Sequence, residues 1–117
     1  MLFVCYPKCS TCQKARKWLE EKGFAYEERD IKTENPSAEE LEMWYKKSGL
    51  PLKRFFNTSG MLYKEMKLKE KLPDMSEEEQ IALLATDGML VKRPIVVTED
   101  EVLVGFREKE WEEKLSR

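Results

Sequence analysis

The stretch LFVCYPKCSTCQKARKWLEEKG, residues 2–23, decides which fold this chain adopts. It begins with a short apolar run that ends at Pro7, and such a run is typical of a buried strand. Over residues 12–22 the apolar side chains recur at helical spacing, with charged residues on the opposite face. The stretch therefore predicts a strand, a loop and a helix, with Cys9 and Cys12 placed where the loop meets the helix.

A second strand and a block of helices follow. Residues 24–31 alternate enough to predict a strand. The block opens where Ser37 and Glu40 have the spacing of a capping box, in which a hydroxyl and a carboxylate each satisfy a free amide. The same spacing recurs at Ser76 ahead of a later helix. Further helix ends and short helical segments of the block are expected at Gly49, residues 51–56, residues 64–71 and Gly88.

The C-terminal part of the chain predicts a β-hairpin and a closing helix. Residues 94–98 are apolar and β-branched, residues 102–104 return after a polar turn, and residues 108–115 have helical spacing. A strand–helix–strand unit followed by strand–strand–helix is the order of a βαβ unit joined to a ββα unit. We therefore expect one α/β domain over residues 1–117, with a thioredoxin-like or glutaredoxin-like fold: a mixed four-stranded sheet with a helical insertion at about residues 37–88.

The composition excludes several kinds of catalysis and of partner. The chain has 117 residues, with 21 Lys and Arg, 23 Asp and Glu, three Cys and no His. Without an imidazole, Ser–His–Asp and Cys–His catalysis and His-containing zinc sites are excluded. The net charge of −2 gives no basic excess for direct binding of nucleic acid. No apolar run reaches the roughly 18 residues of a membrane span, and no signal peptide is recognisable, so we expect a cytoplasmic protein.

The two spaced cysteines are the candidate reactive groups. A helix N-terminus offers free amides and partial positive charge that stabilise a thiolate, and Lys8 adds a cation nearby. We expect Cys9, the more exposed thiol, to attack, and Cys12 to resolve a mixed disulfide on it. Half of a zinc site and a pair of inert buried thiols are the alternatives. Only Cys5 remains as a further sulfur ligand, and we interpret it as an unreactive buried thiol of the first strand.

The dipeptide Arg93–Pro94 is the second candidate part of the site. A thioredoxin-like fold places a cis X-Pro bond opposite the cysteine loop, so we expect Pro94 there and Arg93 beside Cys9. A guanidinium in that place binds an oxyanion bidentately and stabilises a thiolate. A proline at a strand edge and a solvated arginine are the alternatives. Arg107, after the hairpin, is either a second cation at this end of the sheet or a surface charge.

Motifs along the whole chain resemble the ArsC/Spx family of arsenate reductases and redox regulators. In order they are CSTCQKAR, KSGL, FNTSG, KRPIV and VGFR. The resemblance implies a thioredoxin-like fold with a helical insertion. It also implies that Cys9 is the nucleophile and that Arg93 and Arg107 hold an oxyanion, with a third arginine of the family replaced here by Asn57. The expected substrate-binding residues are then Lys8, Asn57, Pro94 and Arg107.

The reductase branch of the family implies reduction of a small oxyanion or a disulfide. The resemblance implies no bound cofactor, with glutathione, glutaredoxin or thioredoxin as the electron donor. Because Asn57 carries no charge, we expect weaker oxyanion binding than an arginine would give, with Lys53 or Arg54 as a partial replacement. The reductases also have a histidine where this chain has Tyr6.

The Spx branch implies a different use of the same cysteines. There the pair Cys9 and Cys12 would be a redox switch in a protein that binds the C-terminal domain of the RNA polymerase α subunit. Gly49 falls where Spx has a glycine at that contact, and it also stands where a helix is expected to end. The sequence leaves enzyme and regulator open.

Overall fold

In the computed structural model, which describes residues 1–115, four strands form one mixed sheet in the order β2-β1-β3-β4. Strand β1 pairs in parallel with β2 and antiparallel with β3, and β3 and β4 form the hairpin that the sequence predicts. This is the sheet of a thioredoxin-like fold, as expected. The strands are β1 (Leu2–Cys5), β2 (Glu27–Asp30), β3 (Ile95–Val97) and β4 (Val102–Val104).

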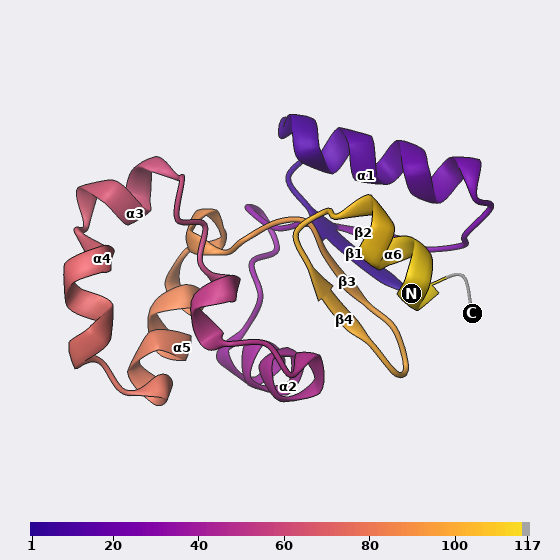
Figure 1. Cartoon of the computed structure of the whole chain (residues 1–117). Coiled ribbons are helices and arrows are strands. Elements are labelled where there is room, and N and C mark those ends of the chain that lie inside the picture. Colours follow the sequence, from indigo (N-terminus) through magenta and orange to yellow (C-terminus); the bar gives the residue numbers. More distant parts are fainter. Residues whose placement is uncertain (116–117) are drawn as a thin grey trace.

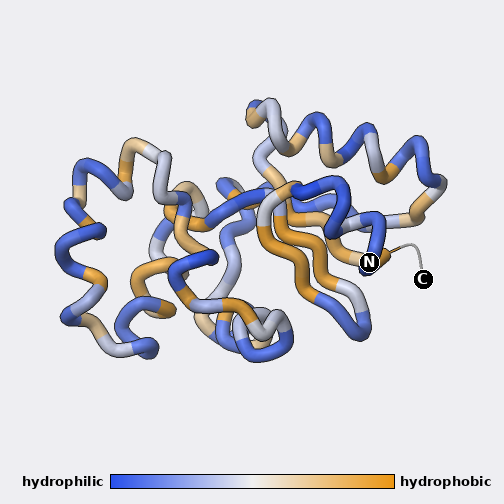
Figure 2. The backbone as a smooth tube through the Cα atoms, in the orientation of Figure 1, coloured by the Kyte–Doolittle hydropathy of each residue, from blue (hydrophilic) through white to orange (hydrophobic). Residues whose placement is uncertain are grey.

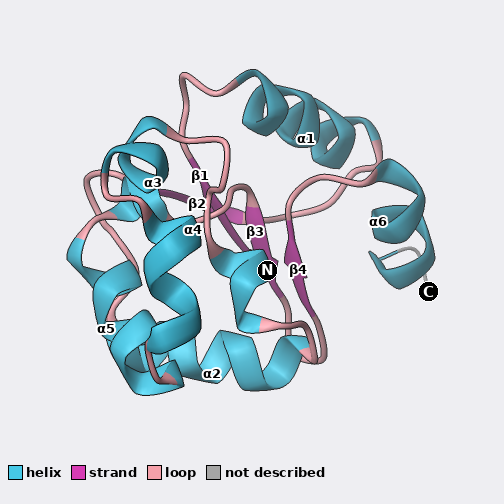
Figure 3. Ribbon diagram, turned by 60° about the vertical axis from the view of Figure 1, so that its left-hand side comes forward, coloured by secondary structure: helices cyan, strands magenta, loops and turns pink. Residues whose placement is uncertain are grey.

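Helices cover both faces of this sheet (Figures 1 and 3). One face carries α1 (Ser10–Glu21) and α6 (Glu108–Leu115), and the helices of the insertion lie on the other. No helix within residues 1–115 is long and apolar enough to cross a bilayer. The insertion contains α2 (Ala38–Ser48), α3 (Met61–Glu65), α4 (Leu68–Lys71) and α5 (Glu77–Thr86), with 3-10 turns η1 (Leu52–Phe55), η2 (Leu72–Asp74) and η3 (Gly88–Leu90).

Alternation along the strands divides the core into two clusters. Val4 packs with the residues of the insertion, whereas Phe3 and Leu103 pack with α1 and α6. In the second cluster the rings of Trp18 and Trp111 meet edge to face, with centroids 5.8 Å apart. Figure 2 shows β1, β3 and β4 as hydrophobic stretches of the chain, whereas β2, with the sequence EERD, is hydrophilic. Both faces of β1, β3 and β4 are therefore largely buried, whereas Glu27 and Glu28 of the edge strand β2 are exposed.

Two details of the insertion differ from the prediction. The single helix expected at residues 64–71 is two helices, because Lys67 takes a left-handed conformation (φ 53°) between them. Helix α5 ends at Thr86, and Gly88 begins η3 instead of ending the helix. A Cβ on Gly88 would lie 1.7 Å from the carbonyl oxygen of Ile31, so glycine is required there by close approach of two backbone segments.

An ion pair attaches the insertion to the edge strand β2. Arg29 donates from Nη1 and Nη2 to the two carboxylate oxygens of Glu40 at 2.6 and 2.8 Å. Glu40 also completes the predicted capping box with Ser37. Hydrogen bonds from Arg29 outweigh burial and, together with the Ser37 amide, lower the pKa of Glu40 to about 2. Glu79 forms the same box on α5 and has no arginine partner within residues 1–115.

We expect Glu40→Gln to lower the free energy of unfolding by about 1 kcal/mol at pH 7, because the half-exposed ion pair is lost while Gln still serves the capping box. The matched variant Glu79→Gln, which loses no ion pair, is expected to cost less than about 0.5 kcal/mol. Because folding lowers the pKa of Glu40, its stabilisation is present above about pH 4.5 and is lost as the pH falls toward 2. Urea unfolding at pH 7 and pH 3 measures the difference, and equal losses for the two variants at pH 7 would contradict it.

Candidate functional site

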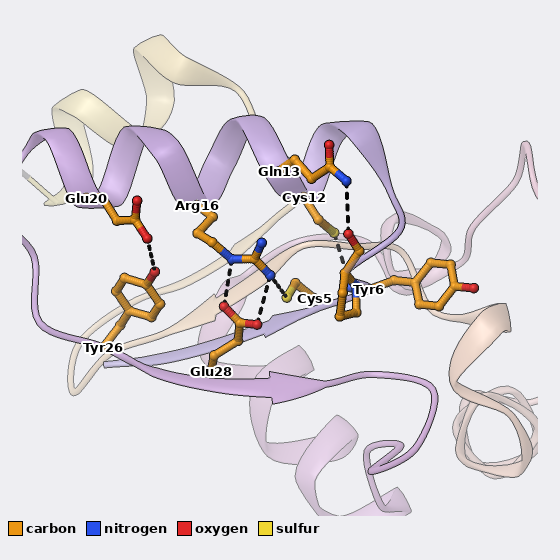
Figure 4. Close-up of polar contacts among 9 residues, drawn as sticks. Cys5, Tyr6, Cys12, Gln13, Arg16, Glu20, Tyr26 and Glu28 are labelled. Atoms are coloured by element: carbon orange, nitrogen blue, oxygen red, sulfur yellow. Dashed lines mark hydrogen bonds and ion pairs between the residues drawn. The ribbon is translucent and has the colours of Figure 1, made fainter.

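Cys9 lies at the junction of β1 and α1. Its amide donates to the carbonyl of Tyr6 at 2.9 Å, and its own carbonyl accepts the amide of Gln13 at 3.0 Å. The Gln13 side chain donates to the carbonyl of Pro7 at 3.1 Å and holds the loop against the helix (Figure 4). The helix begins two residues earlier than predicted, which puts Cys12 in its first turn.

The surroundings of Cys9 favour its thiolate. Burial raises the pKa of the Cys9 thiol, but hydrogen bonds from the Cys12 amide, the Arg93 guanidinium, the Thr11 amide and the Cys12 thiol outweigh burial and lower it. The two amides are free N–H groups at the start of α1, and the guanidinium adds a full positive charge. Because Cys9 is half-buried, its sulfur is still accessible to a substrate.

Cys12 and Cys5 are buried behind Cys9 and have a different character. The Cys12 sulfur accepts the amide of Tyr6 at 3.3 Å (Figure 4). A hydrogen bond with the Cys5 thiol, together with burial, raises the pKa of Cys12 far above its ordinary value. All three cysteines are free thiols. Cys12 therefore holds its proton, whereas the surroundings of Cys9 favour its thiolate.

A cleft of about 620 Å³ opens beside Cys9. Its wall brings together the insertion and the segment before β3, which are joined by an isolated bridge between Phe56 and Val91. Beside this bridge the Asn57 amide donates to the carbonyl of Leu90 at 2.8 Å. These backbone contacts bring Asn57 to the same cleft as the residues that precede β3.

The end of β4 is held against the start of β3. Gly105 donates its amide to the carbonyl of Pro94 at 2.8 Å and accepts the indole N–H of Trp111 at 3.0 Å. The φ of 78° at Gly105 lies in the left-handed region that favours glycine. This turn brings Arg107 to the cleft that also holds Arg93. The Arg93–Pro94 peptide bond is cis, as expected for this fold.

The cleft is positively charged. Two nitrogens of Arg93, Nε and Nη1, are buried and have no hydrogen-bond partner within residues 1–115. The Arg93 guanidinium lies 5.1 Å from the centroid of the Tyr6 ring. Buried donors without partners are costly, so this end of the cleft is suited to an anion. No acidic residue lines the cleft among the described residues, and the cations that do are Lys53, Arg54, Lys92, Arg93 and Arg107.

The cleft gathers some of the predicted site residues and leaves others out. The predicted site residues that line it are Cys9, Asn57, Arg93 and Arg107, together with Lys53 and Arg54.

Two predicted substrate-binding residues and the predicted resolving thiol do not line the cleft. Lys8 is exposed outside it, although it is the nearest cation to Cys9 in sequence. Pro94 and Cys12 are buried away from its wall. Whether a residue next to Cys9 in the chain reaches the cleft thus depends on the direction of the loop.

Sequence reasoning missed several residues of the cleft. Lys92 lines it and stands directly before Arg93, so the dipeptide of two cations was the available signal. Thr58 and Ser59 line it through the turn after η1. In the same turn a Cβ on Gly60 would lie 2.6 Å from Nδ2 of the Asn57 side chain, so the glycine makes room for that side chain. No local pattern pointed to the threonine or the serine.

Comparison with known proteins gives relatives over nearly the whole chain. The model of the ArsC family matches residues 5–114. A crystal structure of an ArsC family related protein from Bacteroides fragilis superposes with a TM-score of 0.94 at 64% identity, over 96% of this chain and 94% of that chain. A possible arsenate reductase from Streptococcus mutans UA159 superposes with a TM-score of 0.87 at 43% identity, over 95% of this chain and 96% of that chain. The global transcriptional regulator Spx of Listeria innocua is 30% identical over 111 residues, which are 95% of this chain and 83% of that protein.

We expect iodoacetamide to modify Cys9 selectively at pH 7, with an apparent pKa below the roughly 8.5 of a free thiol. Arg93→Gln is expected to raise that pKa, because a cationic hydrogen-bond donor is lost. Arg107→Gln is the control, since it removes a cation of the same cleft that is not among the groups lowering the pKa of Cys9. Mass spectrometry of the alkylated peptides identifies the site. Equal shifts in the two variants would contradict a direct role of Arg93.

Proposed function

Because the chain belongs to the ArsC family, we propose that it is a thiol–disulfide oxidoreductase of the arsenate reductase branch, acting in the cytoplasm on a small oxyanion or a disulfide. The observation that carries the proposal is a thiol of lowered pKa, Cys9, facing a cleft lined by cations. Arg93 lines that cleft, and its Nε and Nη1 have no hydrogen-bond partner among the described residues, which suits an anionic substrate. Family membership alone does not distinguish an enzyme from a transcriptional regulator, because the regulator Spx is a relative as well.

The proposed reaction with a disulfide has two steps. The Cys9 thiolate attacks one substrate sulfur, forms a mixed disulfide and releases the other half as a thiolate. Cys12 then loses its proton and attacks the Cys9 sulfur, so that a Cys9–Cys12 disulfide forms and the second thiolate leaves. Glutathione, glutaredoxin or thioredoxin would reduce this disulfide to two thiols and complete the cycle, without a bound cofactor.

The cleft favours an anionic disulfide over a bare oxyanion. A volume of about 620 Å³ is in the range of sites for organic ligands and exceeds what one oxyanion fills. At the position of the third family arginine, Asn57 supplies hydrogen bonds and no charge, so it holds an oxyanion less strongly. Lys53 and Arg54 line the same wall and are suited to the carboxylates of a substrate such as a glutathione mixed disulfide.

We expect turnover of a glutathione mixed disulfide and much slower turnover of arsenate in the presence of glutathione and glutaredoxin. Asn57→Arg is expected to raise kcat/KM for arsenate by about tenfold, because a charged donor replaces a neutral one. Thr33→Arg is the control, since it adds the same charge at an exposed position that does not line the cleft.

Cys9→Ser is expected to abolish both reactions, because the nucleophile is lost. If Cys9→Ser retains the activity of the natural protein, the proposal is wrong. A gain for arsenate in Thr33→Arg as large as that in Asn57→Arg would mean that net charge, and not the third arginine position, limits arsenate turnover.

A redox-switched regulator is the second candidate, favoured by the 30% identity to Spx of Listeria innocua. In this proposal oxidation of Cys9 and Cys12 alters the start of α1 and so changes binding to the RNA polymerase α subunit. Gly49 adds no support, because it ends α2 in a left-handed conformation (φ 68°) and the helix end accounts for the glycine.

A pull-down with the C-terminal domain of the RNA polymerase α subunit distinguishes the two candidates. We expect no binding by either the reduced or the oxidised chain if the protein is an enzyme. Binding that changes between the two redox states, in a chain without turnover of either substrate, would support the regulator instead.

A further inference from the structure

Tyr6 follows β1 directly, and hydrogen bonds hold its backbone on both sides. Its amide donates to the sulfur of Cys12 at 3.3 Å, and its carbonyl accepts the amide of Cys9 at 2.9 Å. The proline at position 7 also restricts the residue before it to extended backbone. In Figure 4 the ring of Tyr6 points away from the buried side chain of Cys12. The ring therefore extends from a backbone that is fixed in place.

The guanidinium of Arg93 lies over this ring. Its central carbon is 5.1 Å from the ring centroid, within the roughly 6 Å over which an aromatic face attracts a cation. Among residues 1–115 no carboxylate forms an ion pair with Arg93, and its Nε and Nη1 are buried without a hydrogen-bond partner. A carboxylate would neutralise the guanidinium and occupy its N–H groups, whereas an aromatic face does neither. The ring thus restrains the guanidinium and leaves it able to bind an anion.

This contact distinguishes Arg93 from the other cations of the cleft. Among the residues that the structure describes, Arg93 is the one cleft cation that lies over an aromatic ring. Lys53 and Arg107 line the same cleft and are exposed. A long side chain loses rotamer freedom when a ligand fixes it, so a guanidinium that is already held binds an anion at a smaller entropic cost.

We propose that Tyr6 is a positioning residue, whose ring holds the Arg93 guanidinium at the cleft while its N–H groups stay free for an anionic substrate. The inference rests on the proposed function for the identity of that substrate, an anionic disulfide. Tyr6 does not itself line the cleft, so its effect on the substrate passes through Arg93. The part of Tyr6 that acts is the face of the ring, which phenylalanine shares and leucine lacks.

Binding of glutathione sulfonate, an anion that cannot exchange a disulfide, measures this effect without turnover. Every chain carries Cys9→Ser, so that the charge of a Cys9 thiolate does not compete with the ligand. In this chain Tyr6→Leu is expected to raise the Kd at pH 7 by about fivefold, because one cation–π contact is lost. Tyr6→Phe keeps the ring face, and its Kd is expected to stay within about twofold of the parent. Isothermal titration calorimetry measures each Kd.

A double-mutant cycle tests whether Tyr6 acts through Arg93. Arg93→Gln alone is expected to raise the Kd by about thirtyfold, because a charged hydrogen-bond donor is lost. Adding Tyr6→Leu to Arg93→Gln is expected to raise the Kd no further, since the group that the ring holds is gone. Tyr26→Leu is the matched control, because it removes another half-buried tyrosine ring, which meets Phe3 edge to face and does not line the cleft.

The outcomes separate this inference from the proposed function. The role of Tyr6 is overturned if the Cys9→Ser chain does not bind glutathione sulfonate, or if Tyr6→Leu binds it as tightly as the parent. Equal weakening by Tyr6→Leu with and without Arg93, or by Tyr26→Leu, also overturns it. The expected pattern of Kd values, together with no turnover of a glutathione mixed disulfide by the natural protein, would support the role of Tyr6 and contradict the proposed function. Circular dichroism verifies the fold of each variant, and Tyr6→Met replaces Tyr6→Leu if that variant does not fold.

Discussion

Burial of β1 on both of its faces is the constraint on which the rest of the structure depends. Val4 packs into the core beneath the insertion, and Phe3 and Cys5 pack against α1 and α6, with none of the three exposed. Because β1 is covered on both faces, a cysteine next to it is accessible to solvent only beyond the end of the strand. There the chain turns through Cys9 into α1, which places one thiol at the rim of the sheet and Cys12 in the core behind it.

The fold also concentrates a charge that the composition conceals. The chain as a whole carries a net charge of −2, but the lining of its cleft contains cations and no acidic residue among the part of the chain that the structure describes. Two acidic residues are engaged elsewhere, in the pairs of Glu28 with Arg16 and of Glu40 with Arg29 that connect β2 to the helices. No acidic side chain of the described lining offsets these cations, so the cleft favours negatively charged groups.

Three identical side chains have three different environments in this arrangement. Cys9 meets helix amides and a guanidinium, and its pKa is lowered. Cys12 meets a buried sulfur and loses contact with water, and its pKa is raised. Cys5, which the sequence presents as an unreactive residue of a strand, accepts a hydrogen bond from Arg16 at 3.8 Å. Environment, and not residue type, distinguishes the partly exposed sulfur of Cys9 from the two sulfur atoms buried behind it.

The sequence by itself determined the features that depend on near neighbours. Residues a few positions apart predict the capping boxes, the hairpin and a cysteine at the start of a helix. The structure confirmed these predictions. Only the tertiary structure decided which cations line the cleft beside Cys9: Lys8, its neighbour in sequence, lies outside the cleft, whereas Arg107, near the other end of the chain, lines it. The same holds for the close approach at Gly88. The reason is that contacts between distant residues depend on how the sheet, the insertion and the last helix pack together, and no local spacing encodes that packing.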